Sequence, residues 1–368
     1  MILGYEAKRI FHNRSGLGNY GRNLIRALAQ HQPDNQYLLY NYKAGPISFA
    51  PGPGVHEIRP PQKGALLAQL WRQRLVSARA ARDGVGIFHG LSAELPYGLP
   101  ARGIRSVVTV HDLIFKRFPH YYQRVDRNLY LRKLRHACRI ADRVVAVSRQ
   151  TRADLVHFLG VPAEKILVVH QGCAPVFWEE QKQAGATLHQ RYQLPAEYVL
   201  FVGTLEPRKN PVLVAQACAR LKIPLVLVGR ATRYWQKFLR QASPAQHKIL
   251  HHRQVSALPD LAALYQNAQC LVYPSQFEGF GIPLLEALAG GTPVITARNS
   301  ALPEVAGPGG LFLDEISEET LIGALQLLWR KPEKREELAA AGRGHVQQFT
   351  DAVLARQWQG LYQEMQAL

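Results

Sequence analysis

Two glutamates, Glu278 and Glu286, stand eight residues apart in the segment YPSQFEGFGIPLLEALA, which spans residues 273–289. An apolar run that predicts a strand ends where this segment starts. Pro283 then takes the first position of a predicted helix, where its fixed backbone angle suits the helix and its missing amide removes no hydrogen bond. Glu278 precedes the helix, within reach of a polar group in a cleft. Glu286 lies about a turn inside it, where a carboxylate can accept two hydrogen bonds from a ribose diol.

The start of that helix is also suited to a phosphate. The amides of Gly281, Ile282 and Leu284 would point out of the first turn, where the positive end of the helix dipole favours an anion. On spacing alone, a helix with a favourable acid near its start and a solvated glutamate in the preceding loop explains the same residues equally well.

Two cations, Arg208 and Lys209, follow another predicted strand in the segment FVGTLEPRKN, residues 201–210. Fixed positive charges at the carboxyl end of a strand can neutralise a diphosphate without a metal ion, because charges act more strongly in a partly dry cleft than in water. An exposed basic turn is the alternative interpretation.

A glycine-rich loop, NRSGLGNYG (residues 13–21), follows the first predicted strand. Its Gly16, Gly18 and Gly21 match the pattern G-x-G-x-x-G, but the acidic residue that a dinucleotide site needs about 20 residues later is missing. The loop therefore predicts only a close approach of the backbone to a phosphate or a sugar.

His111 ends the apolar run VTVHD, residues 108–112, where it would face a cleft at the carboxyl edge of a sheet. A core histidine bonded to Asp112 or to the backbone is the alternative. His251 and His252 have no partner at metal-ligand spacing and are interpreted as surface residues. The sequence contains no DxD, HExxH or GxSxG motif, so metal-dependent transfer and hydrolase chemistry lack their usual parts.

The elements that must position these residues alternate along the chain: short apolar runs are followed by amphipathic stretches, which is typical of parallel α/β domains. The expected strands are 2–5, 37–42, 86–89, 106–111, 143–147, 198–202, 224–228, 270–273 and 293–296. The expected helices are 20–31, 65–82, 121–142, 149–159, 211–221, 259–269, 283–289, 318–330, 332–348 and 351–366. Residues 45–54 are expected to form a loop, and the weakly patterned residues 174–194 a linker between two such units. Ligands of open α/β domains bind at the carboxyl ends of the strands.

The charge is unevenly distributed along the 368 residues, which carry a formal net charge of +18. Residues 1–180 hold 26 Lys and Arg against 12 Asp and Glu, whereas residues 181–368 hold 19 against 15. A negatively charged partner should therefore face the first half, whether nucleic acid, an anionic membrane or a phosphorylated acceptor. Nucleic acid is disfavoured, because the aromatic residues of the basic segments are spaced for packing rather than for stacking on bases.

The expected compartment is the cytoplasm. No run approaches about 18 apolar residues, so no transmembrane helix is expected, and the first residues lack the pattern of a signal peptide. The four cysteines are interpreted as buried thiols in a reducing compartment rather than as disulfides or a zinc site. They are Cys138, Cys173, Cys218 and Cys270.

Taken together, several segments resemble the retaining nucleotide-sugar glycosyltransferases of family four over nearly the whole chain. These segments are GLGNYGRNL, VHD, AVSRQTRADL, VGTLEPRKN, VLVG and EGFGIPLLEALAGGTPVI. The resemblance implies the GT-B fold, an α/β architecture of two Rossmann-like doubly wound domains that face each other across a cleft. The acceptor-binding domain would comprise residues 1–180, completed by 350–368 in a C-terminal helix that crosses back to it. The nucleotide-sugar-binding domain would comprise residues 190–348.

The same resemblance implies roles for individual residues. His111 would contact the transferred sugar, Arg208 and Lys209 the diphosphate, and Glu278 the donor sugar. The further donor-binding positions would be Gly16, Gly18, Thr204, Gly229, Val255, Ser256, Phe280, Gly281, Ile282 and Glu286. Many family members carry arginine at the position of Thr204, so neutralisation of the diphosphate would depend more strongly on Arg208 and Lys209 here.

The implied reaction is a retaining, metal-independent transfer of a hexose from a nucleotide sugar to a glycan or lipid-linked glycan. No cofactor is expected beside the donor, and no carboxylate is an obvious nucleophile, so front-face attack is the expected route. The segments EPRKN and FEGFGIPLLEA look most like the corresponding segments of mannosyltransferases that use GDP-mannose. A UDP-sugar-using glycosyltransferase or epimerase of the same fold is the alternative; a phosphorylase, an inactive module of this fold and a nucleic-acid-binding protein are less favoured.

The expected helix over residues 65–82 has two interpretations. It is either an ordinary core helix with a solvated basic face, or a membrane contact in which apolar residues enter the lipid interface and arginines meet anionic headgroups. The apolar residues are Leu66, Leu67, Leu70, Trp71 and Leu75, and the arginines are Arg72, Arg74, Arg79 and Arg82.

Overall fold

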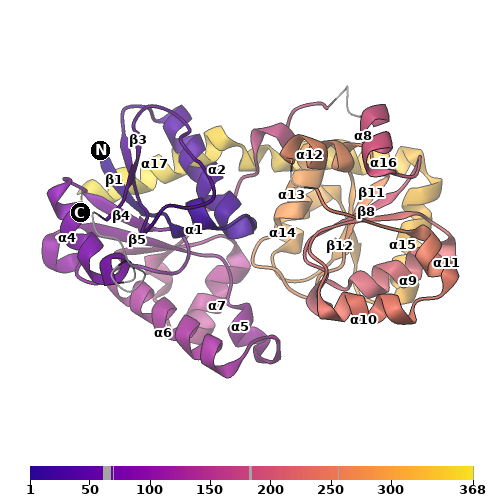
Figure 1. The fold of residues 1–368 in the computed structure, drawn as a ribbon, viewed down its shortest axis with the longest axis horizontal. Helices are drawn as coiled ribbons and strands as arrows, with labels where there is room; N and C mark the ends of the chain where they lie inside the picture. The colour runs from indigo at the N-terminus through magenta and orange to yellow at the C-terminus, as the bar shows by residue number, and fades with distance from the viewer. Residues whose placement is uncertain (61–67, 69, 182–184, 256, 368) are drawn as a thin grey trace. The chain divides into compact units, whose positions relative to one another are not determined.

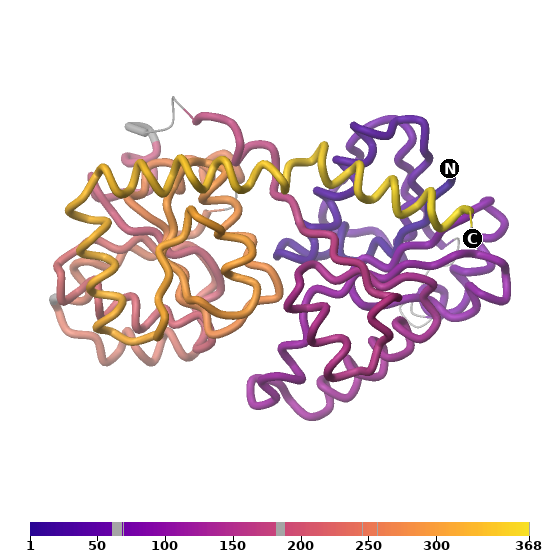
Figure 2. Tube along the Cα trace, turned by 180° about the vertical axis from the view of Figure 1, so that it is seen from behind, coloured from indigo at the N-terminus to yellow at the C-terminus, as the bar shows by residue number. Residues whose placement is uncertain are grey.

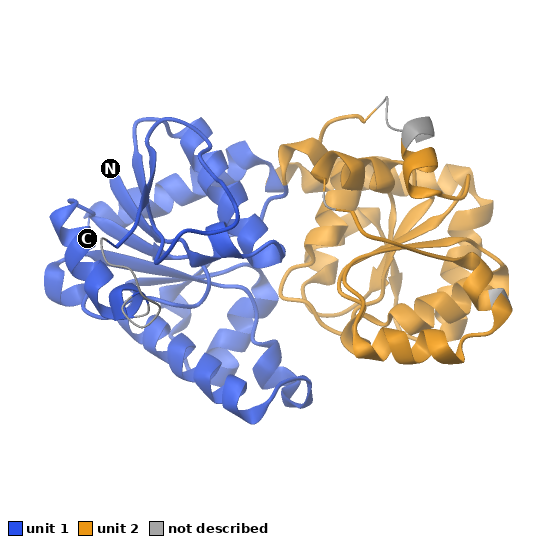
Figure 3. Ribbon diagram, in the orientation of Figure 1, with its two compact units in different colours: residues 1–173, 349–368 blue, residues 174–348 orange. Residues whose placement is uncertain are grey.

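The chain divides into two compact units in a computed structural model that describes residues 1–60, 68, 70–181, 185–255 and 257–367 (Figure 3). Unit 1 comprises Met1–Cys173 together with Phe349–Leu368, and unit 2 comprises Ala174–Gln348. The limits expected from the sequence are 1–180 with 350–368, and 190–348. The expected linker, residues 174–194, thus begins where unit 2 begins and contains the short helix α8 (Gly185–Tyr192).

Unit 1 is built on a seven-stranded parallel sheet with the order β3-β2-β1-β4-β5-β6-β7 (Figure 1). The strands are β1 (Ile2–Glu6), β2 (Gln36–Tyr40), β3 (Val55–Ile58), β4 (Ile87–Gly90), β5 (Arg105–Val110), β6 (Arg143–Ala146) and β7 (Ile166–Val168). The helices are α1 (Lys8–His12), α2 (Gly16–His31), α4 (Val76–Arg82), α5 (Ile114–Arg117), α6 (Arg124–Ile140), α7 (Arg149–Leu159) and α17 (Asp351–Ala367). The central strands are almost entirely buried, as expected for parallel strands that helices cover on both faces.

The C-terminal helix α17 completes unit 1, as expected from the resemblance. It packs along α2, as the view from behind shows (Figure 2). The apolar face predicted for it is buried, and Tyr362 is buried with it. The predicted face consists of Leu354, Trp358, Leu361 and Met365.

Unit 2 contains a six-stranded parallel sheet with the order β10-β9-β8-β11-β12-β13. The strands are β8 (Val199–Val202), β9 (Leu225–Val228), β10 (Leu250–Arg253), β11 (Cys270–Tyr273), β12 (Val294–Ala297) and β13 (Gly310–Leu313). Beside α8, the helices are α9 (Pro211–Leu221), α10 (Arg233–Gln241), α11 (Pro244–Ile249), α12 (Leu258–Gln266), α13 (Ile282–Ala289), α14 (Leu302–Ala306), α15 (Glu318–Arg330) and α16 (Pro332–Val346). Both units therefore have the strand order of a Rossmann-like domain.

The four strands that the sequence pattern missed are the edge strands of the two sheets: β3, β7, β10 and β13. An edge strand has a neighbour on one side only and needs less apolar sequence, and β10 reads LHHR with all four residues half-buried. The interpretation of His251 and His252 as surface residues is wrong for this reason. The missed helices, α1, α5, α8, α10, α11 and α14, are short.

The stretch expected as one helix over residues 65–82 is only partly described, and Leu66 and Leu67 lie outside the described residues. Its described part contains a π-helical turn, Trp71–Leu75, followed by α4. Trp71 is buried against the ring of Tyr40, and Arg72 is buried in ion pairs with two glutamates. Trp71 and Arg72 therefore cannot contact a lipid surface, whereas Leu70 and Leu75 of the same stretch are 44% and 47% exposed, and a membrane contact through them stays a prediction.

Candidate active site

In unit 2 the strand order reverses between β8 and β11, which lie side by side at the centre of the sheet. Ligands of doubly wound sheets bind at the carboxyl ends of the strands at such a switch point. The loop after β8, residues 203–210, carries Arg208 and Lys209. The loop after β11, residues 274–281, carries Glu278. The topology therefore brings together residues that are about 70 positions apart in the sequence.

One carboxylate oxygen, Oε1 of Glu278, has polar contacts with four side chains, which together with Glu278 form the Glu278 cluster. Lys209 Nζ and Arg208 Nη1 each lie 2.8 Å from it. The hydroxyl groups of Tyr273 and Ser275 donate to the same oxygen, each over 2.8 Å. The side chains of the three charged residues are only 11–12% exposed. Neither an exposed basic turn nor a solvated loop glutamate describes them.

The charges of the cluster stabilise one another. Burial alone would raise the pKa of Glu278, but Lys209 and Arg208 outweigh it and lower the pKa to about 2. Burial alone would lower the pKa of Arg208, but Glu278 raises it above its usual value. Arg208 also pairs with Glu206 over 2.7 Å. Glu278 is therefore an ionised carboxylate whose Oε1 has four polar partners, and Glu278 and Glu206 together balance the charges of the two cations.

Two glycines at the carboxyl ends of neighbouring strands let the backbones of the two loops approach each other closely. Gly203 follows β8 and Gly229 follows β9, with φ of 142° and 145°, a conformation that L side chains rarely adopt. A Cβ atom at Gly229 would lie 2.0 Å from the carbonyl oxygen of Gly203. His252 contributes to the same edge, because its Nε2 lies 2.7 Å from the carbonyl oxygen of Gly229. The half-buried Thr204 follows Gly203 in the β8 loop.

The start of α13 differs in two respects from the expectation, the first being that the helix begins at Ile282 and not at Pro283. Gly281 caps the helix with φ of 111°, and a glycine is needed there. The amide of Leu284 donates to the carbonyl oxygen of Gly281 over 2.9 Å, so it does not point out of the helix as expected. Phe280 is buried, and Ile282 is the first helical residue.

Glu286, inside α13, is buried and accepts a hydrogen bond of 2.8 Å from the hydroxyl group of Tyr265 on α12. Burial raises the pKa of Glu286 to about 7, although the bond from Tyr265 opposes this shift. This glutamate can therefore change its protonation state near neutral pH. Of the two residues expected beside the base, Val255 is half-buried in the loop after β10, and Ser256 lies outside the described residues.

In unit 1 the expected glycine loop forms the start of α2. A Cβ atom at Gly18 would lie 1.9 Å from the carbonyl oxygen of Asn13, whereas one at Gly16 would meet no atom within 4 Å. Arg22 holds the preceding loop by donating to the carbonyl oxygens of Ile10 and Asn13 over 2.6 and 3.0 Å. Only Gly18 is therefore required by close backbone packing, and the space at Gly16 is open.

His111 follows β5 at the carboxyl edge of the unit 1 sheet and is half-buried. Its Nε2 lies 2.9 Å from the carbonyl oxygen of Leu91, and the amide of Gln171 donates to its Nδ1 over 3.4 Å. Its ring meets the ring of Tyr20 edge-on, with centroids 4.6 Å apart. Burial lowers the pKa of His111 to about 4, so the ring is neutral at pH 7.

Sequence reasoning missed Tyr273 and Ser275 in the Glu278 cluster and Tyr265 beside Glu286. Tyr273 and Ser275 flank the end of β11, and polar side chains at the carboxyl end of a strand are a signal that would have found them. Tyr265 gives no such signal, because only the packing of α12 on α13 brings it to Glu286.

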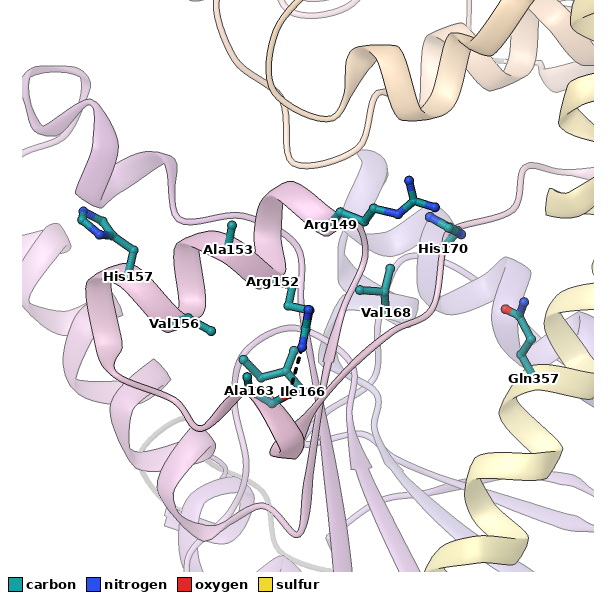
Figure 4. A pocket seen from close by; sticks show the side chains of 10 residues that line it. All are labelled: Arg149, Arg152, Ala153, Val156, His157, Ala163, Ile166, Val168, His170 and Gln357. Carbon is teal, nitrogen blue, oxygen red and sulfur yellow. Dashed lines mark hydrogen bonds between the residues drawn. The ribbon is translucent and has the colours of Figure 1, made fainter.

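A cavity of about 920 Å³ lies in unit 1, between α7, β7 and α17 (Figure 4). Arg149, Arg152, His157 and His170 line it, and its apolar lining includes Val156 and Ile166. No acidic side chain is among its lining residues. The cavity therefore favours an anion.

Two family models together match most of the chain. The model of the glycosyl transferases group 1 matches residues 188–345, and that of glycosyltransferase family 4 matches residues 14–175. The two-sheet GT-B fold and these matches define the class: the chain belongs to the glycosyltransferases.

Among curated proteins, the chain is 29% identical to the O-antigen chain mannosyltransferase B of Escherichia coli, over 95% of this chain and 96% of that protein. It is 26% identical to the serotype-specific mannosyltransferase WbdA of Escherichia coli, over 64% of this chain but only 32% of that longer protein.

Solved structures share the fold at lower identity. Sucrose-phosphate synthase from Thermosynechococcus elongatus has a TM-score of 0.79 at 20% identity, covering 100% of this chain and 99% of that one. Anabaena HepE in complex with UDP has a TM-score of 0.75 at 17% identity, covering 99% of each chain. Both matches confirm the expected two-domain architecture.

Within the described ranges, none of the helices combines the length and the apolar composition that a membrane span needs. The same part of the chain contains no group of three or more His, Cys, Asp or Glu arranged to hold a metal ion. The four cysteines are buried thiols.

Proposed function

We propose that this glycosyltransferase moves mannose from GDP-mannose to a glycan or lipid-linked glycan, with retention of configuration and without a metal ion. The observation that carries the proposal is the pair of cations, Arg208 and Lys209, gathered on Glu278 at the switch point of the unit 2 sheet. A nucleotide diphosphate bound at this edge would meet two positive charges and the start of α13.

The cluster suggests how the donor is recognised. Without a donor, Glu278 and Glu206 together balance the charges of Arg208 and Lys209, and this limits the cost of holding the cations in a largely buried site. When a diphosphate binds, the cations turn to its oxygens, and Glu278 becomes available to accept hydrogen bonds from sugar hydroxyl groups. Binding of the phosphates and recognition of the sugar are then coupled. Glu286 would hold the ribose, and the loops at Gly229, Val255 and Ser256 would border the base.

Bond cleavage places negative charge on the leaving diphosphate while the sugar becomes oxocarbenium-like. Arg208 and Lys209 would stabilise that charge where it develops. Glu278, with its pKa of about 2 and its bonds to two cations, is a weak nucleophile and a weak base. This supports front-face attack, in which the leaving phosphate accepts the proton of the acceptor hydroxyl group. Neutral His111 would contact the transferred sugar from unit 1.

The two kinds of relatives favour different donors. Similarity to mannosyltransferase B over nearly the whole chain favours mannose and GDP-mannose. The structural neighbour with UDP favours the alternative, a UDP-sugar donor.

A thermal-shift comparison with GDP-mannose, UDP-glucose and ADP-glucose separates these donors, because a ligand of the folded state raises the melting temperature. We expect the largest shift with GDP-mannose. The anomeric configuration of the product, read by NMR, then tests retention. A larger shift with a UDP sugar would replace the donor assignment, and an inverted product would overturn the mechanism.

The acceptor should be anionic, because the positive charge gathers in the first half of the chain. The basic cavity between α7 and β7 supports a phosphorylated or lipid-linked acceptor (Figure 4). Substitution of Arg149 and Arg152 by glutamine should raise KM for such an acceptor and leave KM for the donor unchanged. Equal KM values for the acceptor in the variant and the wild type would show that the acceptor does not bind in this cavity.

A further inference from the structure

A chain of hydrogen bonds runs through the core of unit 1, from the C-terminal helix to the neighbourhood of His111. The hydroxyl group of Tyr5 on β1 donates to that of Tyr362 on α17 over 3.2 Å, and the latter lies 2.8 Å from Nδ1 of His89 on β4. Nε2 of His89 lies 2.8 Å from Oγ1 of Thr109 on β5, and this oxygen lies 3.1 Å from the hydroxyl group of Tyr20 on α2. All five side chains are buried, Tyr20 being the most accessible at 4%.

One order of the protons satisfies every bond of this series; it takes Thr109 as the donor in the bond to Tyr20, where either hydroxyl group can donate. Burial lowers the pKa of His89 to about 3, so its ring is neutral and has one donor and one acceptor nitrogen. Burial also raises the pKa of Tyr362 and Tyr20, so both hydroxyl groups keep their protons. Because Tyr5 donates to Tyr362, the proton of Tyr362 is available to Nδ1 of His89. Nε2 of His89 then donates to Thr109, and Thr109 to Tyr20.

The last two members of this series of hydrogen bonds, Thr109 and Tyr20, both lie close to His111. The ring of Tyr20 contacts the ring of His111 edge-on at 4.6 Å with an interplanar angle of 84°, and His111 follows Thr109 by two residues. The carbonyl oxygen of Leu91 and the side-chain amide of Gln171 hold the two ring nitrogens of His111, and the ring of Tyr20 packs against the imidazole ring. The bond to Thr109 anchors the hydroxyl group of the buried Tyr20, so rotation of this side chain would break that bond.

We propose that Tyr362 and Thr109 are positioning residues: through this buried chain, the C-terminal helix holds Tyr20, and through Tyr20 the ring of His111, in one orientation. The inference rests on the proposed function, in which His111 contacts the transferred sugar. Helix α17 would then help to orient His111 as well as stabilise unit 1.

The substitutions Tyr362→Phe and Thr109→Val test this, because each keeps the shape of the side chain and breaks the chain at a different link. Tyr37→Phe is the matched control: it removes a buried hydroxyl group from the same apolar cluster, but this group donates to the carbonyl oxygens of Leu28 and Gln32. The readouts are kcat, KM for the nucleotide sugar, the melting temperature, and the ring nitrogen signals of His111 in full-length protein with ¹⁵N-labelled histidine.

We expect Tyr362→Phe and Thr109→Val to lower kcat about tenfold, as a small misplacement near the reacting atoms does. KM for the donor should stay within about twofold, since the unit 2 cluster is unchanged. The nitrogen signals of His111 should shift in both variants and stay in place in Tyr37→Phe. Wild-type kcat and unshifted signals in both variants, or an equal loss of kcat in Tyr37→Phe, would overturn the inference.

His111→Ala separates this inference from the proposed function. If His111→Ala keeps wild-type kcat, the role given to His111 in the reaction is wrong, and the nitrogen signals alone decide whether the chain orients its ring. If His111→Ala is inactive while Tyr362→Phe and Thr109→Val are fully active, the role of His111 stands and the positioning inference fails.

Discussion

At the scale of single residues, the site of unit 2 is an ion cluster in which each charge has a partner before any substrate binds. Glu278 faces Lys209 and Arg208, and all three are largely buried. Charged groups in such a place affect both folding and chemistry, because removal of one partner leaves the other buried without compensation. The two effects must be separated by experiment.

Lys209→Met should lower kcat by about 100-fold, the size expected when one group that stabilises developing charge is lost. It should also cost roughly 1–3 kcal/mol of stability, because Glu278 loses a buried partner. Adding Glu278→Gln should recover part of the stability but none of the activity. Steady-state kinetics and denaturant unfolding measure both, with the exposed Lys237→Met as the control. Wild-type turnover in Lys209→Met would sink the assignment of the diphosphate site.

Glu286 should make stability depend on pH. In the unfolded chain its carboxyl group ionises near 4.5, whereas burial raises the pKa in the folded state to about 7. Between these pH values the folded protein holds a proton that the unfolded chain releases. The free energy of unfolding therefore falls as the pH rises from about 4.5 to 7, by at most about 3 kcal/mol.

Denaturant unfolding of wild type and Glu286→Gln at pH 4.5, 6 and 8 checks this. The difference between the two proteins should change across this range and then level off, because glutamine does not titrate. Parallel profiles of the two proteins would show that Glu286 ionises normally.

At the scale of elements, α17 is the piece of chain that closes unit 1. Its Trp358 is buried against the rings of His89 and Tyr362, and the helix packs along α2. The helix contributes both apolar area and one end of the buried hydrogen-bonded chain. Loss of either should loosen the sheet of unit 1 before that of unit 2.

Trp358→Ala should cost about 3–5 kcal/mol, the usual range for a large aromatic side chain deleted from a core. Amide exchange should accelerate in β1, β4 and α2 and stay unchanged in the strands of unit 2. The exposed Arg356→Ala on the same helix serves as the control. Unchanged melting and exchange after removal of residues 351–368 would contradict a structural role for α17.

At the scale of the whole molecule, part of the excess positive charge of the first half lies on the exposed surface of helix α6. Helix α6 exposes Val125 (77%), Leu129 (46%) and Tyr130 (43%), together with arginines. The exposed arginines of α6 are Arg124, Arg132, Arg135 and Arg139. This mixture of exposed apolar and cationic side chains suits the interface of an anionic membrane.

Full-length protein should sediment with anionic liposomes at low salt and much less at high salt, since each arginine near the surface contributes about 1 kcal/mol. Val125→Ser with Leu129→Ser should weaken this binding, whereas Leu258→Ser, at an exposed apolar position at the start of α12, should not. Equal binding to neutral and anionic vesicles, or to neither, would leave the charge to a soluble acceptor.

Transfer should also survive EDTA, because Arg208 and Lys209 supply the positive charge at the diphosphate site. The measurement is the initial rate before and after chelation, with re-addition of Mg²⁺ or Mn²⁺. Loss of activity that either ion restores would show that metal charge is required as well.

The sequence by itself determined the class of fold, the central strands and the two polar loops that follow β8 and β11. These features are local: a buried parallel strand needs a continuous apolar run, and a helix start needs proline, glycine or a cap at a defined position. For the same reason it predicted the apolar face of α17. It missed the four edge strands: β3 and β10 carry mixed residues, VHEI and LHHR, whereas β7 and β13 are short runs of three and four residues, ILV and GLFL.

Only the tertiary structure decided which of those residues form ion pairs and hydrogen bonds with one another. Sequence spacing left Glu278 equally compatible with a solvated loop, and the adjacency of β8 and β11 placed it on two cations about 70 residues away. The same holds for Tyr265 beside Glu286 and for Tyr362 beside His89, 273 residues apart. The free energy of a buried charge or hydroxyl group depends on the partner that reaches it, and that partner is brought by the packing of distant elements.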